Sequence, residues 1–285
     1  MENKKIMIPA DVPESMKQEY SKNYRAITND AGRLFLFAVD HKIEHLDPHD
    51  PNHFFEIASQ GQIGAFATQL GLIARYAHEY KNINYIVKLN SKTNLVPTEQ
   101  HDPMSSMLWS VSDVLEFKKN SGASIGTHIR GVGYTIYLGS IYESQMLAQA
   151  AQIVYQAHQH GLVAILWIYP RGVAIKQDGA DAAQLCAGAA GVGVALGADF
   201  VKIKAPSDIN NISNMNALRR AVVSAGNTKV ICAGGIVRDS EQFLRDLREQ
   251  VYTGNSSGCA VGRNIFEKSV PDAIAFTKAI SAVLE

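Results

Sequence analysis

The chain has 285 residues, 46% of them hydrophobic, and a formal net charge of zero. This size suits one large α/β barrel or two smaller domains, and no shift in composition marks a boundary, so we expect a single domain over residues 1–285. The balanced charge argues against a nucleic-acid partner, and no apolar run is long enough for a membrane span or a signal peptide, so we expect a cytoplasmic protein without a membrane partner.

The first predicted element is an amphipathic helix over residues 12–28. Met16, Tyr20, Tyr24 and Ile27 recur at near-helical spacing, and Pro13 is acceptable in a first helical turn. We expect this helix to belong to an N-terminal extension, residues 1–30, that covers one end of the core.

Strand-like and helix-like segments then alternate to the end of the sequence. Eight short apolar runs are predicted as strands, at residues 34–39, 65–68, 85–90, 131–136, 163–169, 200–204, 229–233 and 258–262. Eight strands interleaved with helices in this length indicate a (β/α)8 TIM barrel, with its site at the carboxyl ends of the strands. A doubly wound open sheet is the alternative architecture.

The sixth strand, residues 200–204, carries two lysines where a buried strand normally carries Val, Ile or Leu. Alternation places Lys202 and Lys204 on one face and Val201 and Ile203 on the other. In an apolar surround, burial and mutual repulsion would lower the pKa of such a pair, and a neutral amine is a nucleophile. A solvated pair at the end of an edge strand is the other interpretation of these residues.

Glycine-bearing loops follow the last two predicted strands. Gly234 and Gly235 follow strand seven, and Gly262 and Arg263 follow strand eight. In (β/α)8 barrels these loops commonly bind phosphate through backbone N–H groups, and Arg263 could add charge-assisted contacts. Tight turns alone would also explain the glycines.

Two further strand ends carry candidate site residues. Tyr169 ends strand five, beside Lys202 in a barrel, where a phenol could act as a general acid or base, although a packed tyrosine has the same sequence pattern. Arg171 could bind a second phosphate or form a salt bridge with another loop. Asp40, at the end of strand one, could orient or deprotonate substrate hydroxyls or cap a helix.

Some patterns carry less weight. His41, His45, His49 and His53 recur every four residues, but Pro48 and Pro51 interrupt any helix that would align them, so we expect no metal. The three cysteines, at positions 186, 232 and 259, lack metal-ligand spacing and are interpreted as buried thiols. The loop at residues 91–110 is long, as expected of a substrate cover, a structural excursion or a subunit contact.

Six sequence blocks together resemble the class I, Schiff-base fructose-bisphosphate aldolases of the archaeal and bacterial type, within the DeoC/LacD-like aldolases. In chain order these blocks are AVDH (38–41), KLNSKT (88–93), GYTIYLGS (133–140), WIYPRG (167–172), GADFVKIK (197–204) and AVGRN (260–264). The resemblance runs from about Phe35 to the C-terminus.

The resemblance implies reversible cleavage of fructose 1,6-bisphosphate to dihydroxyacetone phosphate and glyceraldehyde 3-phosphate, without metal or other cofactor, by a homo-oligomer. It selects Lys202 for the Schiff base, Tyr169 for proton transfer and Asp40 as the active-site aspartate. It also implies that the two glycine loops bind phosphate. We further expect Arg171, Lys88 and Lys204 to be substrate or phosphate ligands, with Lys204 as the electrostatic partner of Lys202.

Two departures from the family pattern concern the rim of the site. Lys42 stands where the family usually has glycine, and the loop after Asn90 is longer than in compact archaeal members. Both leave open a Schiff-base acyl- or aldol-transferase that acts on another phosphorylated sugar. A non-catalytic sugar-phosphate sensor, with lysine as a phosphate ligand, is the alternative from a different class.

Overall fold

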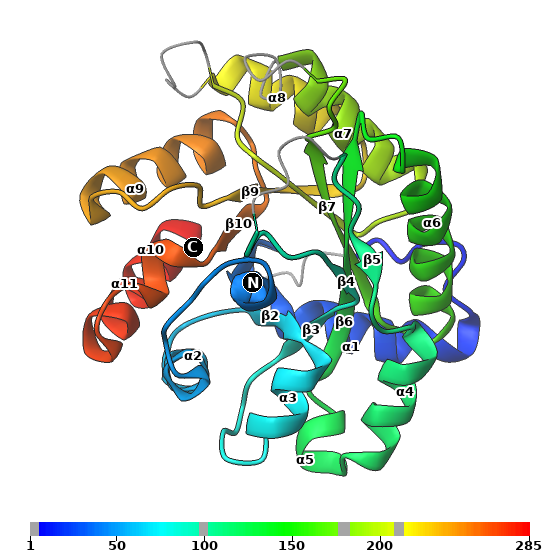
Figure 1. Ribbon diagram of the computed structural model, residues 1–285, viewed down its shortest axis with the longest axis vertical. Coiled ribbons are helices and arrows are strands. Elements are labelled where there is room, and N and C mark those ends of the chain that lie inside the picture. Colours follow the sequence, from blue (N-terminus) through cyan, green and yellow to red (C-terminus); the bar gives the residue numbers. More distant parts are fainter. Residues whose placement is uncertain (1–5, 97–101, 176–182, 208–213) are drawn as a thin grey trace.

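The computed structural model describes residues 6–96, 102–175, 183–207 and 214–285. Eight parallel strands close into a barrel in which neighbours in the chain are neighbours in space (Figure 1). They are β1 (Leu34–Ala38), β2 (Ala65–Gln69), β3 (Tyr85–Lys88), β6 (Ile129–Leu138), β7 (Val163–Pro170), β8 (Phe200–Ile203), β9 (Lys229–Ala233) and β10 (Gly258–Val261). The predicted (β/α)8 barrel is therefore confirmed, and the open sheet is excluded.

Helices surround the strands, and several begin at side-chain caps. Asp50 caps α2, Ser110 and Asp113 form a capping box at α4, and Ser269 caps α11. The outer helices are α2 (Pro51–Gln60), α3 (Leu70–Tyr76), α4 (Val111–Asn120), α5 (Ala123–Gly126), α6 (Glu143–Gln159), α7 (Ala183–Ala195), α8 (Met215–Ser224), α9 (Ser240–Arg248), α10 (Arg263–Phe266) and α11 (Val270–Leu284), with a π-helical turn at Glu249–Thr253. No helix among the described residues has both the length and the apolar character needed to cross a membrane.

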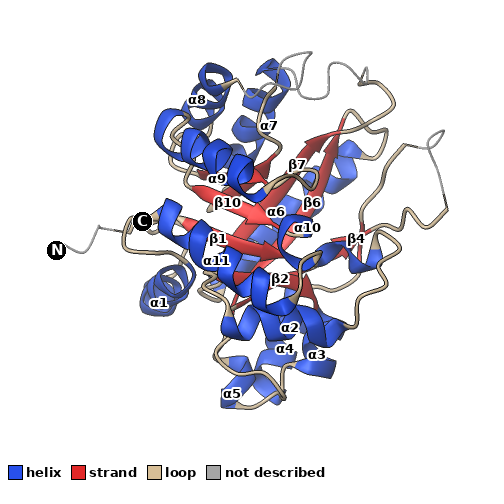
Figure 2. Cartoon of the chain, turned by 90° about the vertical axis from the view of Figure 1, so that its left-hand side faces the viewer, coloured by secondary structure: helices blue, strands red, loops and turns tan. Residues whose placement is uncertain are grey.

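The predicted N-terminal helix is present as a short 3-10 turn, η1 (Glu14–Met16), followed by α1 (Lys17–Ile27). Tyr24 stacks on Phe200 at the start of β8, with ring centroids 5.4 Å apart. Asn23 donates a hydrogen bond of 2.8 Å to the carbonyl of Gly161, just before β7. The helix therefore covers the amino-terminal end of the barrel, opposite β4 (Figure 2).

Strand alternation divides the core into two parts. One surrounds the barrel between strands and helices and includes Val201 and Ile203. The other fills the barrel interior and includes Phe200 and Trp167; its further members are Ile27, Leu34, Leu36, Ala65, Ala67, Ile86, Val163, Ile165, Ile231 and Ala260. Since Lys202 alternates with Val201 and Ile203, it belongs to the interior face, as predicted.

A buried ionic network joins α1 to the amino-terminal end of the barrel. His158 lies between two carboxylates: Nδ1 is 2.9 Å from both oxygens of Asp11, and Nε2 is 3.2 Å from Oδ2 of Asp199. Tyr20 donates to the other Asp199 oxygen, and the backbone N–H of Ala164 donates to Oδ2 at 2.8 Å. Burial alone would lower the pKa of His158, but the two carboxylates outweigh it and raise that pKa to about 9.

The long third loop is attached to the barrel at both ends. Asn90–Ser91 (β4) and Ser106–Met107 (β5) form a small antiparallel sheet. Leu108 and Trp109 donate backbone hydrogen bonds to the carbonyl of Leu89, and the Ser140 hydroxyl donates to that of Pro103. Residues 97–101 of the predicted loop lie outside the described residues.

Candidate active site

The site lies inside the carboxyl-terminal end of the barrel, on the face of β8 that carries Lys202. In the sheet, Lys202 is level with Trp167 of β7 and Ile231 of β9. Its side chain therefore stands one layer above Phe200, which closes the interior below. Only 7% of Lys202 is exposed.

The indole of Trp167 forms the floor of the site. The ammonium nitrogen of Lys202 lies 5.2 Å from the ring centroid, and that of Lys88 lies 5.5 Å from it. The ring can occupy this place because the neighbouring strand β6 has glycine beneath it: a Cβ on Gly133 would approach a ring carbon to 2.2 Å. Gly133 and Trp167 thus set the height of both lysines within the carboxyl-terminal end of the barrel.

Lys88 is the more firmly held of the two lysines. It is fully buried, and its Nζ donates to the carbonyl of Asn90 at 2.7 Å and to the Asn90 side-chain oxygen at 3.2 Å. A carboxylate oxygen of Asp40 lies 3.9 Å away. Burial lowers the pKa of Lys88, but every one of these partners is an acceptor and favours the ammonium form.

Asn90 owes its position to the neighbouring strand. Its side-chain amide pairs with the backbone of Thr135, accepting from the N–H at 2.7 Å and donating to the carbonyl at 2.8 Å. It also donates to the carbonyl of Ser105 at 3.1 Å. The amide is thereby fixed like a peptide group of the sheet, and it fixes Lys88 in turn.

Lys202 differs from Lys88 in having no hydrogen bond or ion pair with any described residue. Burial lowers its pKa, and the charges of Asp40 and Glu44 only partly oppose that effect. An amine that loses its proton readily and has a free lone pair is the better nucleophile. The geometry therefore favours Lys202 over Lys88 for covalent chemistry.

Lys88 is a second lysine close to Lys202, and the charge of Lys202 lowers its pKa. The expectation that Lys204 is the electrostatic partner of Lys202 stays a prediction. Lys204 follows the end of β8 and is half-buried. Its part in substrate binding stays a prediction.

Tyr169 projects from β7 two residues beyond Trp167, at the mouth of the barrel. Burial is the main reason that its pKa is raised, and the charges of Asp40 and Glu44 raise it further. Arg171 acts in the opposite direction, with its guanidinium carbon 5.8 Å from the ring centroid. The structure thus brings Tyr169, Asp40 and Arg171 together, as the sequence predicted.

Two neighbours of these residues were missed by sequence reasoning. Tyr137 of β6 pairs with Tyr169 across the sheet, and its pKa is raised by burial and by the charge of Glu44. Glu44 itself follows the short 3-10 helix η2 (Asp40–Ile43). Its spacing of four residues from Asp40, about one helical turn, was the available signal.

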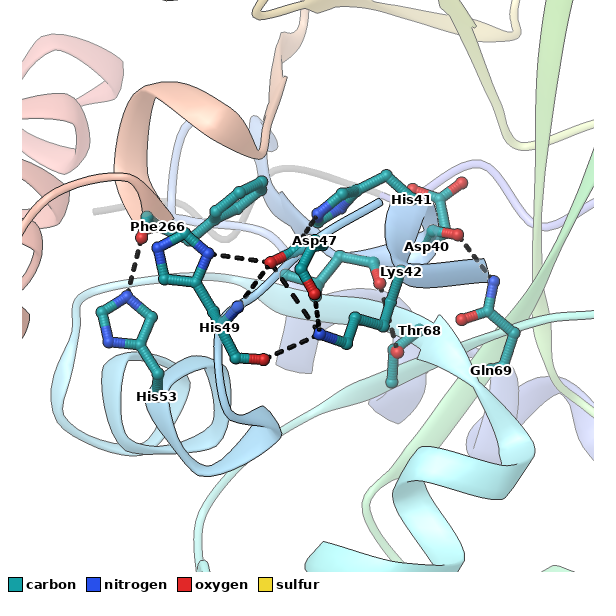
Figure 3. A network of polar contacts seen from close by, with 10 residues as sticks. Asp40, His41, Lys42, Asp47, His49, His53, Thr68, Gln69 and Phe266 are labelled. Atoms are coloured by element: carbon teal, nitrogen blue, oxygen red, sulfur yellow. Dashed lines mark hydrogen bonds and ion pairs between the residues drawn. The ribbon is translucent and has the colours of Figure 1, made fainter. Parts of the chain in front are cut away.

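The loop after β1 is held together by Asp47 (Figure 3). The Asp47 carboxylate bonds to His41 at 2.5 Å and to the ring of His49 at 2.8 Å. Lys42 donates to the carbonyls of Asp47 and His49 at 2.6 and 2.7 Å. Figure 3 shows Lys42 directed to this network and away from the Asp40 carboxylate, so Lys42 braces the loop behind the site.

The four regularly spaced histidines do not share one helix. His41 lies in η2, whereas α2 begins at Pro51 and carries His53, which bonds to the carbonyl of Phe266 at 2.7 Å. Within the described residues, no group of three potential metal ligands is placed to hold an ion. The three cysteines are buried thiols.

The two glycine loops are tied together by Asn264. Its side chain donates to the carbonyls of Gly234 and Ile236 at 3.2 and 3.0 Å. Gly235 has a positive φ of 71°, and a Cβ on Gly262 would lie 2.4 Å from the carbonyl oxygen of Ala38. Both backbones therefore require glycine, and the loops form one surface beside β1.

Cations gather over these loops. Arg263 is exposed and donates to the carbonyl of Gly235 at 3.2 Å. His45, on the β1 loop, has a pKa lowered by its burial and by the nearby charges of Arg263 and Lys92. The positive charges of Arg263 and Lys92 on this side of the mouth suit an anionic ligand.

Residues 34–268 match the DeoC/LacD family aldolases. Over 99% of its length, the chain is 46% identical to a Methanocaldococcus jannaschii protein named fructose-bisphosphate aldolase/6-deoxy-5-ketofructose 1-phosphate synthase, and the match covers 91% of that protein. It is 45% identical to a solved fructose-bisphosphate aldolase from Slackia heliotrinireducens, with a TM-score of 0.92, covering 100% of this chain and 91% of the other.

A further solved structure is an archaeal fructose-1,6-bisphosphate aldolase with its catalytic lysine covalently bound to the carbinolamine intermediate of the substrate. The chain is 28% identical to it, with a TM-score of 0.77, over 93% of this chain and 99% of the other. The family match covers most of the chain, and the relatives are similar over nearly their full length. Both findings agree with the barrel fold and with the buried lysine amine. The chain belongs to the DeoC/LacD family of aldolases.

Proposed function

We propose that the protein catalyses the reversible aldol cleavage of fructose 1,6-bisphosphate through a Schiff base on Lys202. The observation that carries this proposal is the contrast between two buried lysines over one indole: Lys88 is held by acceptors, whereas Lys202 has no hydrogen bond or ion pair with the residues that the structure describes. The names of the relatives support the choice of substrate.

In the forward direction, neutral Lys202 attacks the C2 carbonyl, and loss of water leaves an iminium that withdraws electrons from the C3–C4 bond. The C4 hydroxyl proton passes to the Tyr169 oxygen as that bond breaks, and the O–H proton of Tyr169 passes to C3 of the enamine so formed, so the phenol stays neutral and glyceraldehyde 3-phosphate is released. The resulting iminium of dihydroxyacetone phosphate is hydrolysed, which frees Lys202. The iminium is the electron sink, so the proposed reaction uses no metal or other cofactor.

The two ends of the substrate have different ligands in this proposal. Gly234, Gly235, Gly262 and Arg263 hold the phosphate next to the ketone, which supplies binding energy away from the reacting bond. Arg171, on the other side of the mouth, is the candidate for the distal phosphate. Lys88 faces the reacting carbons, and Lys204 remains a candidate ligand.

Aldol transfer to another acceptor is the second candidate, because the Methanocaldococcus relative is also named a 6-deoxy-5-ketofructose 1-phosphate synthase. Carbons 1 to 3 of that product correspond to dihydroxyacetone phosphate as the donor, and carbons 4 to 6 correspond to methylglyoxal, an acceptor that has no phosphate. The same enamine on Lys202 would serve both reactions. Only the acceptor end, near Arg171, would differ.

The test measures cleavage of fructose 1,6-bisphosphate and, separately, condensation of dihydroxyacetone phosphate with methylglyoxal. We expect cleavage to be lost irreversibly when borohydride is added with dihydroxyacetone phosphate, and to survive borohydride alone. Condensation without cleavage would favour the transferase. A trapped adduct without cleavage or condensation would favour a reaction with another acceptor. If no adduct is trapped, the sugar-phosphate sensor is the remaining candidate.

Tyr169→Phe separates binding from proton transfer in the same assay. We expect the variant to form the adduct but to lose about 10²- to 10⁴-fold in kcat, as is typical when a general acid or base is removed. Unchanged turnover would remove Tyr169 from the mechanism.

That the protein is a cytoplasmic homo-oligomer stays a prediction. Sedimentation of the purified protein tests its oligomeric state.

A further inference from the structure

Glu44 is fixed at the mouth by bonds from two directions. Its backbone N–H donates to the carbonyl of His41 at 2.8 Å, and its own carbonyl accepts from the N–H of Asn94 at 2.7 Å. Its side-chain Oε1 accepts from the Ser91 hydroxyl at 3.2 Å. These contacts join the β1 loop, which carries Asp40, to β4 and the segment after it, and they hold the Glu44 carboxyl at the barrel mouth.

The carboxyl of Glu44 interacts with the side chains that the proposed reaction uses. Its charge acts on both lysines and on the tyrosines of β6 and β7, and these groups together with the second carboxyl face it from five elements: Asp40 on η2, Lys88 on β3, Tyr137 on β6, Tyr169 on β7 and Lys202 on β8. In the described part of the chain, only Asp40 shares this set of neighbours. Glu44 and Asp40 are thus two carboxyls in one confined site.

Charge balance distinguishes the two carboxyls before substrate reacts. The acceptors around Lys88 favour its ammonium form, whereas Lys202 must be neutral to attack, so of the two lysines only Lys88 places a positive charge beside the two acids. Burial raises the pKa of Glu44, and the charge of Asp40 raises it further against the weaker effects of Lys88, Ser91 and Lys202. Two carboxyls that share a site commonly retain one proton between them, and the raised pKa of Glu44 favours Glu44 as the carboxyl that holds it.

We propose that Glu44 supplies the proton with which the carbinolamine hydroxyl on Lys202 leaves as water. This inference rests on the Schiff-base reaction proposed above. The Glu44 carboxyl gives its proton to the C2 hydroxyl oxygen, the C2–O bond breaks, and the nitrogen lone pair forms the C=N bond. A neutral acid and a neutral carbinolamine become a carboxylate, an iminium and water, so the carboxylate balances the new positive charge.

The alternative role for Glu44 is purely structural, as a clamp between the β1 loop and Ser91. The two roles differ in their pH dependence. A proton donor must be protonated, so iminium formation falls as pH rises through the pKa of Glu44, after rising at lower pH as Lys202 loses its proton. A clamp would change the amount of folded enzyme or the affinity for substrate without creating this alkaline fall.

The experiment follows iminium formation with dihydroxyacetone phosphate by timed borohydride quenching and intact-mass analysis, across pH. Glu44→Gln keeps the acceptor oxygen for Ser91 but cannot donate an acid proton. We expect its rate of iminium formation to fall about 100-fold or more, with the alkaline fall abolished and with unchanged affinity for dihydroxyacetone phosphate. Glu44→Asp, which keeps an acid, should restore the alkaline fall.

Ser91→Ala is the matched control for folding. The Ser91 hydrogen bond lowers the pKa of Glu44, so its removal raises that pKa and should move the alkaline fall to higher pH. A lower pH for that fall, or a Glu44→Gln variant that keeps the alkaline fall or loses less than about threefold in rate, would overturn the proposal. If the wild type itself forms no adduct, the proposed function fails; if it forms one and Glu44→Gln matches it, only the role of Glu44 fails.

Discussion

The two ends of the barrel bury ionisable side chains in different ways. At the amino-terminal end, His158 bonds through both ring nitrogens to Asp11 and Asp199, and Asp199 also accepts from Tyr20. At the carboxyl-terminal end, the Lys202 amine has no hydrogen-bonding partner among the described residues, and the buried Nε1 of Trp167 likewise has none.

This difference separates stability from chemistry. A paired buried charge stabilises one arrangement of the chain, and breaking the pair is costly because the remaining charge is stranded. An unpaired buried amine instead loses its proton and becomes reactive. The amino-terminal network should therefore affect unfolding and not turnover, and the lysines at the mouth should do the reverse.

The largest effect is expected when the two lysines are exchanged for Met one at a time. Lys202→Met removes the nucleophile and should lower kcat at least about 10⁴-fold, with no trapped adduct. Lys88→Met leaves the Asn90 carbonyl and Asp40 without their cation, so we expect a loss of about 10- to 100-fold with the adduct retained. Steady-state cleavage kinetics check both; equal losses would contradict the assignment.

At the opposite end, His158 should make stability depend on pH. Its folded pKa of about 9 lies above the unfolded value of about 6.5, so its contribution is fully present below pH 6.5 and is lost as pH rises to about 9. The expected loss in free energy of unfolding is on the order of 3 kcal/mol. Urea denaturation of the wild type and of His158→Gln measures it; the same slope in both would rule out His158.

Gly133→Ala tests the floor between the two ends. The new Cβ would lie 2.2 Å from the Trp167 ring, so the indole must shift beneath both lysines. We expect a loss of about 1–3 kcal/mol in stability and slower adduct formation.

Gly71→Ala is the matched control, because Gly71 lies in α3 with open space where its Cβ would stand. Its free energy of unfolding should rise by up to about 1 kcal/mol. Equal effects at both sites would contradict the packing argument.

The smallest effect is expected at Lys42, which braces the β1 loop and points away from Asp40. Lys42→Met should lower the free energy of unfolding by less than about 1 kcal/mol, because the side chain is partly exposed. The value of kcat should change less than about threefold. A tenfold rise in KM for fructose 1,6-bisphosphate would instead place Lys42 at the substrate.

The elements of the barrel could be predicted because each depends on local patterns. Apolar runs of four to eight residues mark the strands, and alternation alone puts Lys202 on the interior face with Phe200. Tyr169 and Asp40 were found because both end a strand at the face where (β/α)8 barrels bind ligands. The expected helix over residues 12–28 is present because its apolar spacing matches a covering helix.

The contacts that position the site residues and distinguish their roles could not be predicted, because they join distant parts of the chain. Asn90 holds Lys88 only because β3 pairs with β6 and so brings Thr135 beside it. Trp167 is the floor only because the facing strand has glycine at position 133. The Glu44 carboxyl is held in place by a contact with Ser91, 47 residues away.

The most direct test of the account is to locate the covalent bond. Wild-type enzyme is treated with dihydroxyacetone phosphate and borohydride, digested, and analysed by peptide mass spectrometry, with Lys88→Met and Lys202→Met in parallel. We predict the reduced adduct on the Lys202 peptide in the wild type and in Lys88→Met, and on neither lysine in Lys202→Met. An adduct on Lys88 would contradict the central claim that the unpartnered amine is the nucleophile.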